Sequence, residues 1–170
     1  GRNGEPPTVG LGLAVWRPER PHNLGALVRL CACWDVPLDI IEPAGFALDD
    51  RRIREAALDY GRHARWRCFV DGDSFLATRR AEGRRLVLLS TSGSVAYHHA
   101  VYGENDVLTL GNERHGVPRL VHAAAELCVR IPLLAGRRSL NVATAAAIVL
   151  GEALRQLGRL DALMAMGPAR

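Results

Sequence analysis

Residues 107–118 read Val-Leu-Thr-Leu-Gly-Asn-Glu-Arg-His-Gly-Val-Pro, which joins an apolar strand signal to a polar loop. The loop has Gly111 and Gly116 on either side of Glu113. Two glycines around a carboxylate allow a sharp turn and a close approach of the backbone to a ligand. In an open α/β sheet, ligands bind at the carboxyl ends of strands. The loop is therefore a candidate binding site, and a plain polar turn is the alternative.

Apolar strand signals and helix signals alternate on both sides of this loop. Short apolar runs predict strands at residues 9–15, 38–42, 67–70, 86–90, 107–110 and 127–131. Capped or periodic segments predict helices at 24–34 after an N-cap at Asn23, 49 or 50 to 58, 73–82 from Asp73, 119–125 and 141–157. This alternation predicts an α/β fold with a mainly parallel sheet.

The chain length favours a single domain. A chain of 170 residues buries most of its apolar surface without metal or disulfide staples. The Gly- and Pro-rich residues 1–10 are expected to form a flexible extension, residues 11–158 the folded domain, and residues 159–170 a C-terminal tail.

The composition is that of an ordinary globular protein, with 48% hydrophobic and 24% charged residues. No apolar run reaches the roughly 18 residues of a membrane span, so no membrane association is expected. The four cysteines show no spacing typical of a disulfide framework. A reducing, cytoplasmic setting is expected.

The net charge is +4, and all 22 basic residues are arginine. Guanidinium groups match the geometry of phosphates, which favours an RNA partner. A compositional preference for Arg over Lys explains the same count equally well.

Two further segments place polar residues at the starts of predicted helices. Pro21-His22-Asn23-Leu24-Gly25 leads to Arg29, which lies off the apolar stripe of its helix. Residues 131–141 contain Ile-Pro and then Arg-Ser-Leu-Asn before the last long helix. The N–H groups at a helix start can bind a ligand. Helix capping and a solvated arginine are the alternatives.

No motif supports a metal site or a Gly-rich nucleotide loop. The pair Cys31-x-Cys33 with His22 resembles half of a zinc site, but it lies in an apolar helix and no second pair follows. Packing is the favoured role for these cysteines, and no metal is expected.

The three polar segments, taken in order, resemble the three motifs of the SPOUT RNA 2′-O-methyltransferases. They are Asn-x-Gly-x-x-x-Arg from Asn23, Gly-x-Glu-x-x-Gly-x-Pro from Gly111, and Ile-Pro followed by Arg-Ser-x-Asn from Ile131. Residues 41–46, 58–60 and 152–156 add similarity to the compact tRNA (cytidine/uridine-34-2′-O)-methyltransferase branch. The resemblance covers roughly residues 11–158, and the ordered set is far more specific than any single motif.

The resemblance implies a parallel sheet whose C-terminal part forms a deep trefoil knot, with S-adenosylmethionine bound in the knot. It implies tRNA as the partner, the wobble nucleotide 34 as the target, and no role for DNA. It also implies a homodimer. The first and last helices are expected at the dimer interface, where Ala143, Ala146 and Ala147 would allow close approach.

The resemblance also assigns site residues. Arg29 would help remove the hydroxyl proton or stabilise the developing alkoxide, and Glu113 could orient Arg29 through a bidentate pair. Asn23 and Asn141 would fix these groups. The implied cofactor contacts are Leu89, Gly111, Ile131 and Ser139, with Ser90 and Leu140 as neighbours.

The chain departs from the family pattern in several places, which bear on the RNA substrate more than on the cofactor pocket. The departing residues are Ala26, Ser92, His115, Ala143 and Thr144. Two other functions stay open: 2′-O-methylation at another tRNA or rRNA site, and a catalytically silent RNA-binding homologue. Ribosomal relatives usually carry an added RNA-binding domain.

Overall fold

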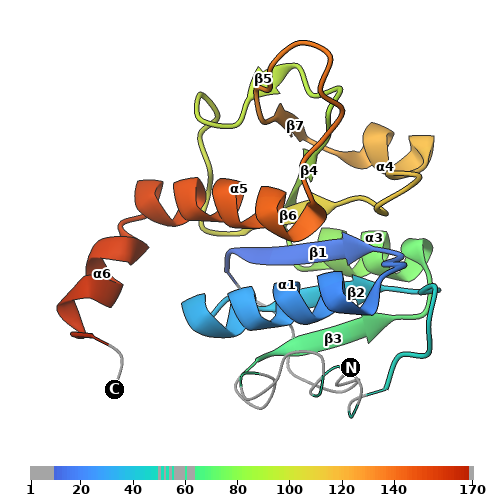
Figure 1. The fold of residues 1–170 in the computed structure, drawn as a ribbon, viewed down its shortest axis with the longest axis horizontal. Coiled ribbons are helices and arrows are strands. Elements are labelled where there is room, and N and C mark those ends of the chain that lie inside the picture. Colours follow the sequence, from blue (N-terminus) through green and yellow to red (C-terminus); the bar gives the residue numbers. More distant parts are fainter. Residues whose placement is uncertain are drawn as a thin grey trace.

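The computed structural model describes residues 10–49, 51, 53, 55, 60 and 64–168. Within these residues, seven parallel strands form one sheet in the order β3-β2-β1-β6-β4-β7-β5, with helices on both faces (Figure 1). The prediction of an α/β fold with a parallel sheet is confirmed.

The strands lie close to their predicted positions. They are β1 (Gly12–Trp16), β2 (Leu38–Ile41), β3 (Trp66–Phe69), β4 (Arg85–Leu89), β5 (Val95–Ala96), β6 (Asp106–Leu110) and β7 (Leu127–Arg130). The sequence did not predict β5, because two residues give no periodic signal.

The helices also agree with the predicted pattern. They are α1 (Pro21–Trp34), α3 (Gly72–Ala81), α4 (Arg119–Ala124), α5 (Val142–Gln156) and α6 (Arg159–Ala165). The helix predicted from residue 49 or 50 to 58 falls mostly outside the described residues. The segment expected to be a C-terminal tail forms α6, a helix that the sequence analysis missed.

Two predicted helix caps are wrong, whereas the helix capping that was the alternative role for residues 131–141 is present. Helix α1 begins at Pro21 after Arg20, so Asn23 lies inside its first turn. The cap of α3 is Asp71, whose carboxylate accepts a 2.8 Å hydrogen bond from the Ser74 N–H, so Asp73 lies inside the helix. Asn141 caps α5 by accepting from the N–H groups of residues 143 and 144. The displacement of Asn23 into the helix frees its side chain for other contacts.

Side chains of β1 divide between the two faces of the sheet, as strand geometry requires. Leu13 and Val15 belong to a core with α1 and α5. Ala14 and Trp16 belong to a second core with α3 and α4. Both cores are buried, so the sheet is covered on both sides.

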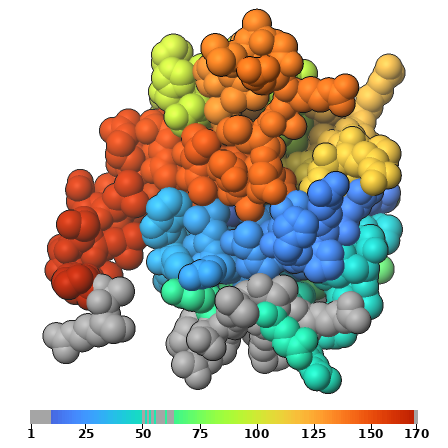
Figure 2. All heavy atoms as spheres, viewed as in Figure 1, coloured from blue at the N-terminus to red at the C-terminus, as the bar shows by residue number. Residues whose placement is uncertain are grey.

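Helices α1 and α5 lie side by side on one face (Figure 1). In the space-filling view, the start of α5 and the loop before it (orange) sit directly against the start of α1 (blue) (Figure 2). This arrangement brings together segments that are more than 100 positions apart in the sequence.

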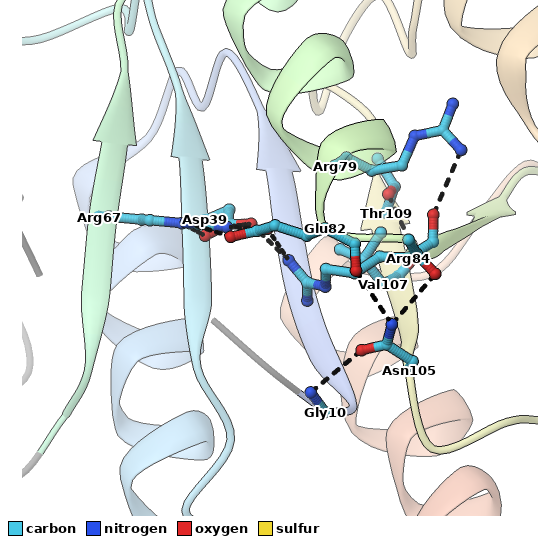
Figure 3. Close-up of polar contacts among 10 residues, drawn as sticks. Gly10, Asp39, Arg67, Arg79, Glu82, Arg84, Asn105, Val107 and Thr109 are labelled. Atoms are coloured by element: carbon cyan, nitrogen blue, oxygen red, sulfur yellow. Dashed lines mark hydrogen bonds and ion pairs between the residues drawn. The ribbon is translucent and has the colours of Figure 1, made fainter. Parts of the chain in front are cut away.

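A buried ion-pair cluster joins β2 and β3, near their amino ends, to the turn between α3 and β4 (Figure 3). The Arg67 guanidinium donates to Asp39 at 2.7 Å and to Glu82 at 2.7 Å. Arg84, whose side chain is fully buried, donates to Asp39 at 3.0 Å. Burial lowers the pKa of Arg84, and its contacts with Asp39 oppose that shift. The cluster lies at the end of the sheet away from the carboxyl ends of the strands.

In the part of the chain that the structure describes, no helix is both long and apolar enough to cross a membrane.

Candidate functional site

A cavity of about 710 Å³ lies at the carboxyl ends of β4, β6 and β7. This is the edge of a parallel sheet at which ligands bind. Its wall comes from the loops that follow these strands and from the start of α5. The wall includes every position that the resemblance assigned to cofactor contact: Leu89, Ser90, Gly111, Ile131, Ser139 and Leu140.

The loop after β4 is fixed against β7. The Ser90 N–H donates to the Val129 carbonyl at 3.0 Å. A Cβ at Gly93 would lie 2.5 Å from the Val129 carbonyl carbon, so the backbone contact requires glycine. The loop is therefore held rigidly along one side of the cavity.

The loop after β6 closes on itself. Asn112 and Gly116 exchange two backbone hydrogen bonds of 2.9 Å. The Asn112 side chain accepts from the N–H groups of Arg114 and His115, and it donates to the Arg17 carbonyl at 2.6 Å. A Cβ at Gly111 would lie 2.7 Å from the Gly116 Cα. The loop is thus compact, and its tight crossing point depends on glycine.

The Glu113 carboxylate connects this loop to the start of α1. It accepts hydrogen bonds from the N–H groups of Glu19 and Arg20, both at 3.0 Å, and from Asn23 Nδ2 at 3.1 Å. Partial burial opposes ionisation of Glu113, but the hydrogen bonds outweigh it and lower the pKa below the ordinary 4.5. Glu113 is therefore a fixed carboxylate at neutral pH.

Asn23 extends the connection to α5. Its Oδ1 accepts from Asn141 Nδ2 at 2.9 Å, and Asn141 caps α5 with its own oxygen. Asn23 is only 4% exposed, so both ends of its amide are used inside the protein. The structure brings Asn23, Glu113 and Asn141 into one chain of hydrogen bonds on the cavity wall.

Arg29 lies elsewhere. Its guanidinium stands over the Tyr60 ring at 4.5 Å from the centroid, and its side chain is exposed on α1. It does not line the cavity, and Glu113 bonds to Glu19, Arg20 and Asn23 instead. The predicted Arg29–Glu113 pair is therefore wrong within one subunit, because α1 directs Arg29 toward Tyr60, whereas Glu113 in the loop after β6 bonds to the start of α1.

The cysteines of the hypothetical zinc corner also separate. Cys31 is buried, and burial raises the pKa of its thiol, whereas Cys33 is exposed. Two residues apart on a helix, the pair points in different directions.

The N–H groups of Glu19 and Arg20 hold Glu113, a role that no feature of the sequence predicted. Backbone donors leave no residue-type signal. The contacts of Asn112 were also not predicted, although an asparagine between two loop glycines is a signal for local side-chain hydrogen bonding.

The profile of the SpoU rRNA Methylase family matches residues 10–151, which contain the whole cavity wall. The chain belongs to this family. A relative from Beijerinckia indica, named tRNA (cytidine(34)-2′-O)-methyltransferase, is 49% identical over 152 residues. That match covers 89% of this chain and 95% of the relative. A protein of the same name from Escherichia coli K12 is 38% identical over 91% of this chain and 98% of its own.

Solved structures of similar fold include one described as giving insight into 2-OH methylation of C/U34 on tRNA. It superposes with a TM-score of 0.80 at 35% identity, covering 86% of this SpoU chain and 95% of its own. An AdoMet-bound rRNA methyltransferase from Sinorhizobium meliloti gives a TM-score of 0.79 at 28% identity. The match covers 89% of this chain but only 58% of that one.

Proposed function

We propose that this SpoU-family protein methylates the ribose 2′-hydroxyl of nucleotide 34 in tRNA, with S-adenosylmethionine as the methyl donor. The cavity carries the proposal, because the six positions expected to contact cofactor all lie on its wall. The relatives support the substrate. Two of them, which match this chain over 95% and 94% of their own length, are both named tRNA (cytidine(34)-2′-O)-methyltransferase.

The cavity fits the cofactor chemically. Leu89, Leu110 and Ile131 supply apolar surface for a flat heterocycle, and Ser139 with nearby backbone groups supplies hydrogen-bonding partners. Its volume lies within the 300–1,000 Å³ range typical of small-molecule sites. S-adenosylmethionine would bring an activated methyl group, so the protein has chiefly to orient the reactants.

The residues of this chain supply positioning and charge. Glu113 fixes the loop after β6 to the start of α1, and Asn23 and Asn141 fix the start of α5 to the same point. Arg29 is proposed to bind the phosphate beside the target ribose and to stabilise the developing alkoxide. The hydroxyl proton would pass to solvent or to a neighbouring phosphate oxygen, since a guanidinium stays protonated.

A homodimer and a trefoil knot belong to the same proposal. Arg29 lies outside the cavity wall of its own subunit, which supports an RNA site built from two subunits. Residues 88–91 and 138–142 line the same cavity, as a knotted C-terminal segment would require. Ala146 is fully buried in its own core, so Ala143 and Ala147 are the small residues left for a dimer contact. We also propose residues 11–158 as the catalytic domain and the cytoplasm as its location.

Mass spectrometry of nucleosides tests the function. Total tRNA and rRNA are purified from cells with and without the gene, and purified protein is then added to the deficient RNA with S-adenosylmethionine. We expect the 2′-O-methyl group at position 34 of tRNA to be absent from cells that lack the gene. The purified protein with S-adenosylmethionine should restore it in vitro. Loss of a ribose methyl group from rRNA alone would refute it.

A further inference from the structure

A second cavity, of about 500 Å³, lies on the other side of the loop after β6. It opens at the carboxyl ends of β1 and β2, beside the first cavity. Asn112, His115, Gly116 and Val117 line both. A ligand in the second cavity would therefore be separated from the methyl donor by a single loop.

The floor of this cavity is built by three segments that are tied together. The Arg17 N–H donates to the Ile41 carbonyl at 2.8 Å, and the Gly45 N–H donates to the Pro18 carbonyl at 2.9 Å. A Cβ at Gly45 would lie 3.0 Å from the Glu19 Cα, so the two segments touch through their backbones. Residues 43–45 belong to the 41–46 segment, for which the methyl-transfer mechanism gives no role.

Arg17 is held in a costly conformation in this cavity. Its φ is +47°, a left-handed conformation that residues with a Cβ rarely adopt. Its N–H and its carbonyl are both bound, to Ile41 and to Asn112. Backbone strain of this kind persists where the surrounding structure fixes it, and it gathers at functional sites.

The Arg17 side chain forms a stacking surface. Its guanidinium lies against the ring of buried Trp16, 5.6 Å from the centroid, while the residue itself stays exposed. Planar guanidinium groups stack on nucleobases, and unpaired RNA bases are recognised in this way. Glu19 also lines the cavity, and the Arg114 guanidinium, 3.7 Å away, offsets its charge; Arg17 adds a positive charge that attracts RNA phosphates.

We propose that the second cavity binds an anticodon-loop nucleotide adjacent to the methylated one, with its base stacked on Arg17. This inference rests on the proposed tRNA substrate and deepens it. The apolar surfaces of Pro43, Val117 and Pro118 would contact the base edge, and the volume suits one nucleoside. Binding there would fix the position of the target ribose relative to the first cavity.

The test measures binding without turnover, so it is separate from the methylation assay. A fluorescent anticodon stem-loop RNA with cytidine at position 34 is titrated with protein saturated in S-adenosylhomocysteine. Arg17→Asn is the test variant, because asparagine tolerates the left-handed backbone better than other side chains. Arg80→Asn is the matched control, an exposed arginine near the end of α3, far from both cavities.

Arg17→Asn is expected to raise the RNA dissociation constant roughly 10-fold, as loss of one stacking contact does. The control is expected to change it less than about 2-fold, and the affinity for S-adenosylhomocysteine should stay unchanged in both. Equal losses in the two variants would show that only general charge matters and would overturn the proposal.

A second arm identifies the nucleotide. Stem-loops with an abasic residue on either side of position 34 are titrated against the parent and Arg17→Asn. One of the two abasic RNAs should bind the parent protein weakly. Its affinity should fall little further with Arg17→Asn, because the abasic site and the substitution remove the same contact. Additive losses for both RNAs would overturn the proposal. Failure of the parent to methylate tRNA would instead refute the proposed function.

Discussion

Asn23 and Glu113, 90 positions apart in the sequence, are joined by a hydrogen bond of 3.1 Å from the Asn23 amide to the carboxylate. The other end of the same amide accepts from Asn141. One buried side chain therefore connects the first helix, the loop after β6 and the cap of α5. All three of these segments line the cavity, so this connection helps to fix its shape.

Replacing Asn23 with Ala should damage both stability and cofactor binding. The change removes one of the three hydrogen bonds to the Glu113 carboxylate and the Asn23 acceptor of Asn141 Nδ2, which costs about 1–3 kcal/mol of unfolding free energy. Urea unfolding and calorimetry with S-adenosylhomocysteine measure the two effects. Asn105→Ala is the control. The Asn105 side chain also makes hydrogen bonds, to Gly10 and Gly83, but it lies at the amino ends of the strands, away from the cavity. It should lower stability without changing cofactor affinity; a change in affinity would contradict the connection.

Glu113→Gln should lower stability in a way that depends on pH. The pKa of Glu113 is lowered in the folded protein, so its contribution is fully present above the ordinary value of 4.5. That contribution is lost as the pH falls through the lowered folded pKa. The difference in unfolding free energy between parent and variant should be steady near pH 7 and should shrink in acid. A difference that grows in acid would show that the shift has the opposite sign.

Gly111→Ala should disable the cofactor cavity. The added methyl group would meet backbone atoms of Gly116, which cannot rotate away. A displacement of about 1 Å in a binding loop costs on the order of 100-fold in rate. Gly151→Ala is the control, because its added methyl group meets only Trp34 at 3.5 Å. Single-turnover methylation and S-adenosylhomocysteine titration should separate the two variants.

Arg29→Ala should abolish methyl transfer and leave cofactor affinity nearly intact. Arg29 lies outside the cofactor cavity, so its loss changes no wall residue. Losing a well-placed charge-stabilising donor costs about 100- to 1,000-fold in rate. Arg29→Lys should be severely impaired as well, because lysine lacks the planar fork. A single-turnover assay on unmodified tRNA decides the matter, with Arg80→Ala as control. Near-normal rates for Arg29→Ala would remove Arg29 from the mechanism.

Sedimentation at micromolar concentration should give a homodimer. Ala147 is half-buried on α5, and Ala147→Glu would place a charge in the expected interface. This variant should sediment as a monomer and lose methylation activity, whereas Ala81→Glu on α3, across the sheet, should remain a dimer. A parent protein that methylates RNA as a monomer would contradict the two-subunit site.

The sequence by itself determined the α/β alternation, most element positions and three of the segments that line the cavity. Strand and helix periods are local properties, so Val107–Leu110 and the cap at Asn141 could be recognised without any long-range information. Glycines at 111 and 116 likewise marked a tight loop. The segments' order carried the family resemblance that the relatives bear out.

Only the tertiary structure decided which polar groups meet. Asn23 looked like a helix cap, but α1 starts at Pro21 and turns the amide inward to Glu113. Arg29 and Glu113 looked like an ion pair, yet backbone N–H groups take the carboxylate and Tyr60 takes the guanidinium. Such choices depend on helix orientation and on backbone donors, which every residue except proline shares, so no residue pattern encodes them locally.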